Sequence, residues 1–403
     1  MTRLLARIDR RLVWPKAYYF FYYSAAVSLI PFLSVYYKGL GLSGREIGLL
    51  TGIPPLISLF GAPFWSGLAD ATRQHRRLLL VATVCTLLAV WALSSARTFL
   101  LLVVFVTIYA FFVSPIMPLI DNSVIEMLGE HKNQYGRQRY WGAVGWGLAA
   151  PLVGWLVERN GMRWYFYGFL GLMLFALYTS TRMHVTRASI GARFWSGLRA
   201  LVTSRTWLLF LVAVFLGGMS MAMISNFLFL YMDDLHAGEA LMGLSLTVAT
   251  LSEIPVMFFS EPLIRRWGAK GLLNLALLAY VVRLLAYSFI RLPWLVLPIQ
   301  LLHGPTFSAL WVGGVSYADE ISPPGMGTTA QGILAGAMMG LGGTLGALAG
   351  GLLYDEVGGA AMFRWTGAGL LLVTLAFMLA DRSSSPLSRQ VAAGRGDGNE
   401  RMG

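Results

Sequence analysis

The chain has 403 residues, of which 57% are hydrophobic and only 12% are charged. Soluble domains carry about 25% charged residues, so this composition excludes an ordinary water-exposed surface and favours a lipid bilayer. The net charge of +12 suggests a nucleic-acid partner only at first sight, because the basic residues lie in short tracts and form no continuous basic face. Cys85 is the only cysteine, which excludes an intrachain disulfide.

Long apolar runs between polar segments predict twelve transmembrane helices in two sets of six. The expected fold class is therefore an all-α membrane protein with two six-helix halves, as in transporters built from repeats. Pro115 and Pro118 are expected to kink the fourth span. The spans are expected near residues 17–37, 46–69, 78–96, 98–127, 138–157 and 163–182, and near 206–232, 240–264, 271–290, 293–318, 328–353 and 360–381.

The longest polar interruption, residues 183–205, predicts the domain boundary. An N-terminal bundle at 1–182 precedes this linker, and a C-terminal bundle at 206–382 follows it. The Gly- and Arg-rich tail at 383–403 is expected to be disordered.

Lysine and arginine residues precede the first span and recur in alternate loops. The positive-inside rule then predicts that both termini and the linker are cytoplasmic, in a multi-pass protein of the inner (plasma) membrane. Aromatic residues at span ends are interpreted as interfacial anchors, and acidic residues of the opposite loops as solvated. The aromatic residues are Tyr18, Tyr19, Tyr36 and Tyr37. The acidic residues are Asp233, Asp234, Glu239, Asp355 and Glu356.

A glycine, an aspartate and three arginines stand at short spacings after the second span: Gly67, Asp70, Arg73, Arg76 and Arg77. This pattern resembles the signature between spans two and three of the major facilitator superfamily. The resemblance implies that the loop takes part in the conformational switch. We expect the glycine to allow close helix packing, and the aspartate and arginines to pair and to cap helix ends.

The segment from Glu126 to Trp146, which includes Arg139, is similar to the span four–five region of lactose permease. The resemblance implies that Glu126, Arg139 and Trp146 bind a sugar or couple protons. Arg139, Gly142 and Trp146 share one helical face. The guanidinium of Arg139 beside the indole of Trp146, with the space left by Gly142, suits a ring that carries hydroxyls or a carboxylate. Asn122 and Glu126 share a face of the fourth span, and a salt bridge between Glu126 and Arg139 is the alternative.

The segments around Glu253, Arg283 and His303 also resemble lactose permease, although Thr306 stands where that family has a glutamate. Residues 302–307 and Asp121 look more like the phenylpropionate permease branch.

Glu253, Arg283 and His303 all fall near mid-depth when helix rise is counted at 1.5 Å per residue. A charge at that depth costs about 2.5–3.5 kcal/mol, so it is expected to face a cavity or a partner. Either Glu253 alternates between protonated and paired states, or it forms a static ion pair with Arg283. Because Thr306 has no carboxylate, Glu253 or Asp121 is the expected proton carrier.

The sequence therefore predicts a proton-coupled symporter that imports a sugar-like or aromatic-carboxylate solute. Its expected partners are this solute, H⁺ and membrane lipid, with no cofactor, metal or nucleic acid. Export is the alternative, because residues 147–154 partly resemble a motif of drug antiporters, and a membrane-embedded enzyme is disfavoured because no catalytic motif is found. The expected substrate-binding residues are Glu126, Arg139, Trp146, Asn122 and His303, and the expected proton-coupling residues are Glu253, Arg283, Asp121 and His303.

Overall fold

The computed structural model describes residues 12–183, 204–322 and 326–382. Within these ranges the chain forms helices and turns without a strand, which confirms the all-α prediction. Most of the linker expected at 183–205, and all of the tail expected at 383–403, lie outside the described residues, and the domain boundary stays a prediction.

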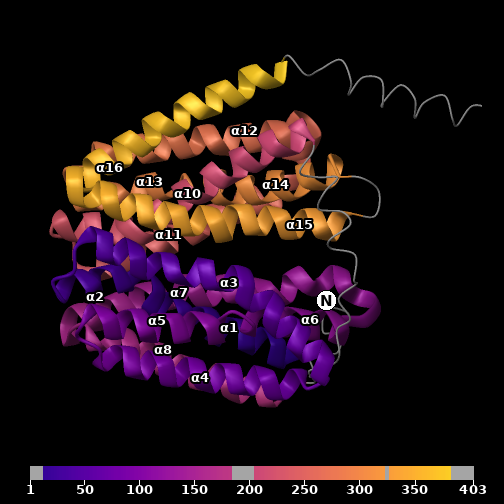
Figure 1. The fold of residues 1–403 in the computed structure, drawn as a ribbon, viewed down its shortest axis with the longest axis vertical. Coiled ribbons are helices and arrows are strands. Elements are labelled where there is room, and N and C mark those ends of the chain that lie inside the picture. The colour runs from indigo at the N-terminus through magenta and orange to yellow at the C-terminus, as the bar shows by residue number, and fades with distance from the viewer. Residues whose placement is uncertain (1–11, 184–203, 323–325, 383–403) are drawn as a thin grey trace, which may run out of the picture.

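The helices form two layers, one from each half of the sequence (Figure 1). The N-terminal layer contains α1 (Val13–Leu29), η2 (Ile30–Phe32), α2 (Leu33–Gly39), α3 (Gly44–Thr72), α4 (His75–Ser95), α5 (Phe99–Val113), α6 (Ile116–Leu128), η3 (Gly129–Gln134), α7 (Tyr135–Asn160) and α8 (Arg163–Thr181). The C-terminal layer contains α10 (Arg205–Asp234), α11 (Glu239–Phe258), α12 (Ser260–Ser288), η4 (Pro293–Leu295), α13 (Val296–Gln300), η5 (Gly304–Ser308), α14 (Ala309–Glu320), α15 (Gly327–Ala335), η6 (Gly336–Gly342) and α16 (Gly343–Arg382).

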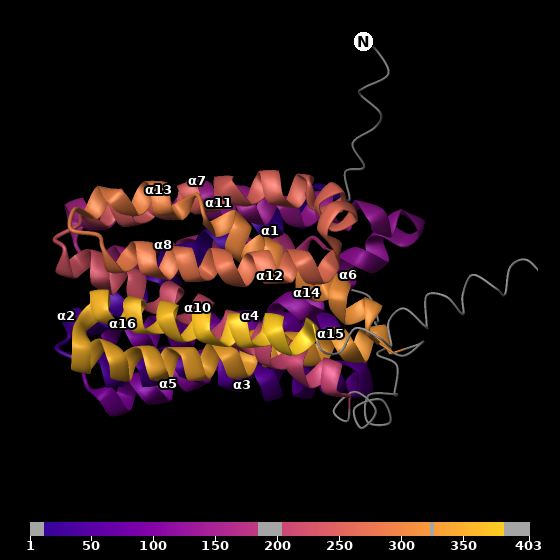
Figure 2. The ribbon, with the colours of Figure 1, turned by 90° about the horizontal axis from the view of Figure 1, so that it is seen from above.

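Nine helices in the described ranges are long and apolar enough to cross a bilayer, or ten if one bent pair counts as a single span. One of the nine covers residues 329–378 and includes the non-helical Gly358, where α16 turns back (Figure 1). The count of twelve spans stays a prediction. The helices run along one common direction, with α2 at one end of the bundle and α6, α14 and α15 at the other (Figure 2). We call these the α2 end and the α6 end.

Two breaks interrupt long apolar segments. The fourth expected span ends its first helix at Val113 and resumes at Ile116, so it is interrupted at Pro115, one of the two prolines expected to kink it. The tenth expected span bends by 42° between residues 293–300 and 304–320. An ionisable residue lies close to each break, Asp121 on α6 and His303 within the bend itself.

The two halves meet through two helix pairs that repeat the same contacts. α3 packs on α16 and α11 packs on α7, so the second helix of each half pairs with the fifth span of the other. A Cβ added at Gly48 of α3 would lie 2.6 Å from the Ala347 carbonyl oxygen of α16. A Cβ added at Gly243 of α11 would likewise overlap the Ala150 carbonyl oxygen of α7. Each pair therefore needs a glycine where the backbones approach closely.

Hydrogen bonds between the halves are confined to one part of the bundle. Among the described residues, they all lie between the α2 end and the middle of the helices. The two that lie deepest run from Thr247 Oγ1 to the Gly147 carbonyl, at 2.7 Å, and from Thr344 Oγ1 to the Gly52 carbonyl, at 3.3 Å. Towards the α6 end, the described parts of the halves share no hydrogen bond or ion pair.

Candidate functional site

Glu253, His303 and Arg283 form a continuous polar chain across three helical segments. Glu253 Oε1 of α11 lies 3.1 Å from His303 Nε2, and His303 Nδ1 lies 2.9 Å from Arg283 Nη1 of α12. The structure therefore brings together the three mid-depth residues that the sequence singled out. His303 lies between the two charges, and no direct ion pair joins Glu253 to Arg283 in the described coordinates.

The hydrogen bonds assign the tautomer of His303. A guanidinium nitrogen can only donate, so His303 Nδ1 must accept from Arg283 and carry no proton. The ring proton of neutral His303 then lies on Nε2 and is donated to the Glu253 carboxylate. Protonation of Nδ1 would require His303 to leave Arg283. In this arrangement Glu253 is the group that can accept a proton without breaking the chain.

Arg283 is held by neutral acceptors and is only 2% exposed. Its Nη1 also donates to Thr306 Oγ1 at 3.0 Å, its Nε donates to the Tyr287 hydroxyl at 3.1 Å, and its Nη2 donates to Gln300 Oε1. Sequence reasoning missed Tyr287 and Gln300. The available signal was Gln300, a lone polar side chain within the apolar run before His303.

The bend at residues 301–304 positions His303 against α11. The Gly304 amide donates to Ser252 Oγ at 2.9 Å, and a Cβ at Gly304 would overlap the Ser252 carbonyl oxygen. Glu253 follows Ser252 directly, so this backbone contact fixes the distance between Glu253 and His303. A π-helical turn over Gly304–Ser308 widens the helix after the bend.

A second polar cluster lies in the N-terminal half. Arg139 Nη1 donates to Asp121 Oδ2 at 2.7 Å and to the Tyr135 hydroxyl at 2.8 Å. The Tyr23 hydroxyl accepts from Arg139 Nη2 at 3.1 Å, and the Tyr19 hydroxyl donates to Asp121 Oδ1 at 2.6 Å. The interpretation of Tyr19 as an interfacial anchor is wrong, since its side chain is fully buried and binds Asp121.

In the described structure, no hydrogen bond or ion pair joins the other residues predicted in this half to that cluster. Glu126 forms no ion pair with Arg139, and its buried Oε2 has no hydrogen-bond partner in the described structure. Trp146 packs against Val27 and its neighbours. The gap expected at Gly142 is filled, because a Cβ there would overlap the Tyr23 ring.

Both polar clusters lie on the α6 side of the interface between the halves. α7 and α11 are joined at Gly147 and Thr247. Arg139 precedes Gly147 by two turns and Glu253 follows Thr247 by nearly two turns, so both lie beyond the last inter-half hydrogen bond of this pair. The side chain of Arg139 remains 46% exposed and that of Glu253 remains 25% exposed. Both clusters are thus partly exposed on this side of the interface.

Comparison with known proteins identifies the family of the chain. The family model described as "MFS_1 like family" matches residues 12–365 of the chain. The chain belongs to this family of major facilitator superfamily (MFS) transporters. The maltose permease of Geobacillus stearothermophilus is 31% identical over 358 residues, covering 88% of this chain and 91% of the permease. The probable 3-phenylpropionic acid transporter of Escherichia coli is 27% identical and covers 75% of this chain and 81% of that protein.

Solved structures show the same MFS fold. The nucleoside transporter NupG superposes with a TM-score of 0.82 at 17% identity, covering 92% of this chain and 98% of that one. A bacterial homologue of the human lysosomal transporter Spinster superposes with a TM-score of 0.72 at 14% identity, covering 92% and 96%. The predicted superfamily is thus confirmed, as is the expectation of a transporter rather than an enzyme.

The signature loop of this MFS protein makes other contacts than expected. Asp70 Oδ1 lies 3.2 Å from Nε2 of the buried His75, rather than against an arginine. Arg76 does cap a helix end, because its Nη2 donates to the Thr181 carbonyl that ends α8. Arg73 has a φ of 56° at the end of α3. Arg77 donates only to nearby Gln74.

The close packing expected at Gly67 is absent. Gly67 is exposed, and a Cβ built there would meet nothing within 4 Å. Glycines that do bring helices together lie in the inter-half pairs, at Gly304, and at contacts within one half such as those of Gly145 and Gly218.

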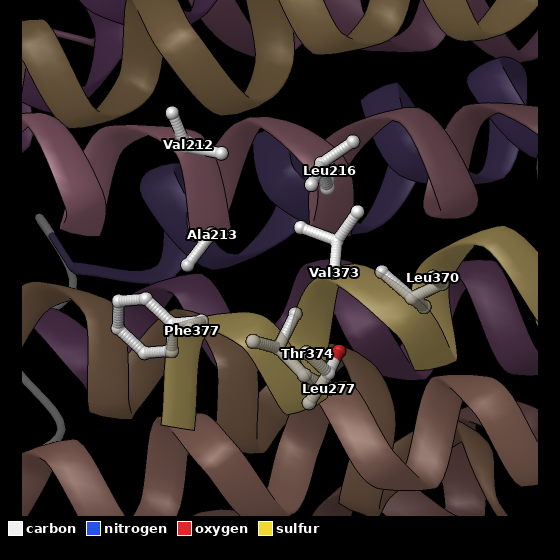
Figure 3. A pocket seen from close by; sticks show the side chains of 8 residues that line it. All are labelled: Val212, Ala213, Leu216, Leu277, Leu370, Val373, Thr374 and Phe377. Carbon is white, nitrogen blue, oxygen red and sulfur yellow. The ribbon is translucent and has the colours of Figure 1, made fainter. Parts of the chain in front are cut away.

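An apolar pocket among α10, α12 and α16 lies apart from both polar clusters (Figure 3). Val212, Leu277 and Phe377 are among its walls, and the Thr374 hydroxyl is its only polar side-chain group. Its lining contains no charged side chain and shares no residue with either polar cluster.

Gly304→Ala is expected to disrupt the C-terminal cluster. The added methyl group overlaps a backbone carbonyl that cannot rotate away, so α11 and the bend must separate. We expect a loss of about 1–3 kcal/mol in the free energy of unfolding, typical of overpacking. Thermal unfolding of purified protein in detergent measures this loss.

Gly67→Ala is the matched control, because it adds the same methyl group to a helix at a site with open space. It should be neutral or stabilise the protein by up to about 1 kcal/mol, as expected when alanine replaces glycine in a helix. Equal destabilisation by both substitutions would contradict the role assigned to the Gly304 contact.

Proposed function

We propose that this MFS protein is a proton-coupled symporter that imports a small organic solute by alternating access. The observation that carries the proposal is the chain from Glu253 through His303 to Arg283. The buried guanidinium of Arg283 is surrounded by neutral acceptors. Its charge is balanced by one carboxylate, that of Glu253, to which it is linked through the imidazole of His303.

Proton uptake by Glu253 changes that balance without dismantling the chain. The incoming proton binds Oε2, while Oε1 continues to accept the hydrogen bond from His303 Nε2. The carboxylate loses its charge, and Arg283 keeps its positive charge within the cage of Gln300, Thr306 and Tyr287. Protonation therefore alters the electric field at the site and leaves its geometry in place, as expected of a coupling residue.

The solute is proposed to bind between the two clusters, against Arg139, Asp121 and His303. Asp121 already neutralises Arg139, so the pair offers both acceptors and donors with no net charge. Such a pair suits a hydroxylated ring better than a second carboxylate, which would compete with Asp121. A sugar-like solute is therefore favoured over an aromatic carboxylate. Asn122, Glu126 and Trp146 are proposed to contribute to binding when the halves move.

The protein is proposed to lie in the inner membrane with both termini in the cytoplasm. The concentration of arginine and lysine at the α6 end supports this orientation. The α2 end, where the halves are joined, then faces outwards, and the two clusters face the cytoplasm. This arrangement corresponds to an inward-facing state.

The test uses protein reconstituted in liposomes and records solute-driven pH change across a panel of sugars and aromatic carboxylates. We expect a sugar to drive proton uptake with the wild type. With Glu253→Gln, proton movement should vanish while binding and exchange of labelled solute persist.

Glu261→Gln is the matched control, because Glu261 is an exposed carboxylate that pairs only with Arg265 one turn away. Proton movement that survives Glu253→Gln would transfer the coupling role to Asp121. Solute movement with no proton movement in any variant would overturn symport, and proton movement opposite to the solute, with uptake of protons during solute exit, would favour an exporter.

A further inference from the structure

Two carboxylates at the α2 end each accept hydrogen bonds from the first amides of a helix in the other half. Asp355 Oδ1 accepts from the Gly44 amide, and Asp355 Oδ2 accepts from the Arg45 amide at 2.9 Å. Glu158 Oε2 accepts from the Ala240 amide at 2.9 Å. Gly44 and Arg45 begin α3, whereas Ala240 is the second residue of α11.

These two contacts occupy equivalent positions in the two halves. Glu158 and Asp355 each stand three residues before a glycine with positive φ, Gly161 and Gly358. The helices that they cap begin three residues after Gly41 and His236, which also have positive φ.

The glycines one turn earlier repeat as well. A Cβ at Gly351, four residues before Asp355, would overlap the Gly44 carbonyl oxygen. A Cβ at Gly154, four residues before Glu158, would overlap the Glu239 carbonyl oxygen. The same device, a glycine that allows close approach and a carboxylate that caps the opposing helix, thus occurs twice around one approximate two-fold axis.

We propose that Asp355 and Glu158 form a paired latch that holds the α2 end closed and sets the balance between the two access states. The first amides of a helix have no partners within the helix and carry its positive dipole end, so a carboxylate there is stabilising. Separation of the halves at this end breaks both contacts together. The inference goes beyond the proposed function, because it concerns access to the site and not the solute or the proton.

The two contacts differ in what replaces them when the latch opens. α3 keeps a cap of its own, since the Ser43 side chain and Glu46 form a capping box at its start. α11 begins after Gly238 and has no side-chain cap from its own segment. Opening therefore leaves the start of α11 uncapped, and loss of Glu158 should favour the open state at least as strongly as loss of Asp355.

The other ionic contacts at this end join side chains only. Arg45 Nη2 donates to Glu356 Oε1 at 2.8 Å, with both side chains more than half exposed. Lys38 lies 2.8 Å from Asp233 and also binds Asp234. Exposed pairs of this kind contribute little, so the latch is assigned to the backbone contacts. The interpretation of these acidic residues as merely solvated is wrong for Asp355 and for the Lys38 partners.

The experiment measures the distance between the halves by spin-label spectroscopy in detergent and in lipid nanodiscs, with no solute and no proton gradient. The labels are attached at Asn160→Cys and Arg291→Cys in a Cys85→Ser background. Asn160 ends α7, and Arg291 follows Ile290, whose carbonyl accepts from Tyr231 near the end of α10. Both sites are exposed at the α2 end and lie in opposite halves.

Asp355→Asn and Glu158→Gln are each expected to raise the ratio of open to closed molecules about fivefold, and together about 25-fold, because distant contacts add. Glu356→Gln is the matched control, because it removes the same charge from the residue next to Asp355 but removes no backbone hydrogen bond. The distances between the two labels in this variant should equal those of the wild type.

If Glu158→Gln does not fold, Glu158→Asp is the alternative variant. It keeps the charge, but its shorter side chain does not reach the Ala240 amide, so it should give a similar shift.

Unchanged distances in Asp355→Asn and Glu158→Gln would overturn the latch. An equal shift in Glu356→Gln would assign the effect to overall charge and overturn it too. Because neither outcome depends on proton movement, failure of the latch and failure of symport are distinguishable.

Discussion

Asp121→Asn is expected to reduce uptake of the solute by about 100-fold in kcat/KM, measured as initial uptake into proteoliposomes. Asp121 accepts one charge-assisted hydrogen bond from Arg139 and, through its other oxygen, one from the Tyr19 hydroxyl. An asparagine amide cannot accept at both positions, and each lost bond to a charged group is worth about 1.5–3 kcal/mol. Arg139 would then rotate away from the face that binds the solute.

Glu126→Gln provides the comparison within α6. Glu126 lies five residues after Asp121 but has no contact with Arg139. We expect its substitution to reduce uptake less than Asp121→Asn does. A larger loss with Glu126→Gln would mean that Glu126 replaces Asp121 as the partner of Arg139 during transport.

Arg283→Leu is expected to lower the free energy of unfolding by about 3–5 kcal/mol and to abolish coupled uptake. Removal of one member of a buried charged network leaves the others without partners. Here His303 Nδ1 and the Tyr287 hydroxyl lose their donor, Gln300 Oε1 keeps only the hydrogen bond from the Tyr287 hydroxyl, and the negative charge of Glu253 loses its balance. Thermal unfolding in detergent measures the first effect, and proteoliposome uptake the second.

The double variant Arg283→Leu with Glu253→Gln separates these two causes. It removes both charges, so it should recover about 1–2 kcal/mol of the lost stability without recovering proton coupling. Arg266→Leu on the same helix is the control, because Arg266 is exposed and should change stability by less than about 0.5 kcal/mol. No recovery in the double variant would argue against charge balance through His303.

The superfamily was predicted from the resemblance of the motif at residues 67–77 to a known signature. Hydropathy and charge patterns were sufficient to predict most of the helices and the grouping of Glu253, Arg283 and His303. These features follow from helix rise and bilayer thickness, which are properties of single helices. The order of contacts within the group was not predictable. It depends on the bend at Gly304, which places His303 between Glu253 and Arg283. The two charged side chains are therefore linked through His303 instead of forming the direct ion pair that the sequence also allowed.

The partner of Arg139 illustrates the same limit. Asp121 and Glu126 lie on different faces of α6, and only the rotation of that helix after the break at Ser114 and Pro115 decides which one meets Arg139. The tyrosines of α1 were misassigned because hydropathy cannot distinguish a side chain at the lipid boundary from one that faces another helix. Contacts between the halves were likewise invisible, since sequence periodicity carries no information about which helix ends meet.

The confinement of inter-half hydrogen bonds to one end has a consequence for ligand affinity measured from the two sides. A solute that arrives from the α6 end reaches Arg139 and Glu253 without breaking any hydrogen bond that joins the described parts of the halves. A solute from the α2 end binds only those molecules in which these bonds are already broken, so its apparent dissociation constant is the intrinsic one divided by that fraction. The same site therefore has two apparent affinities in a sealed vesicle, and their ratio reports the free energy that keeps the α2 end closed.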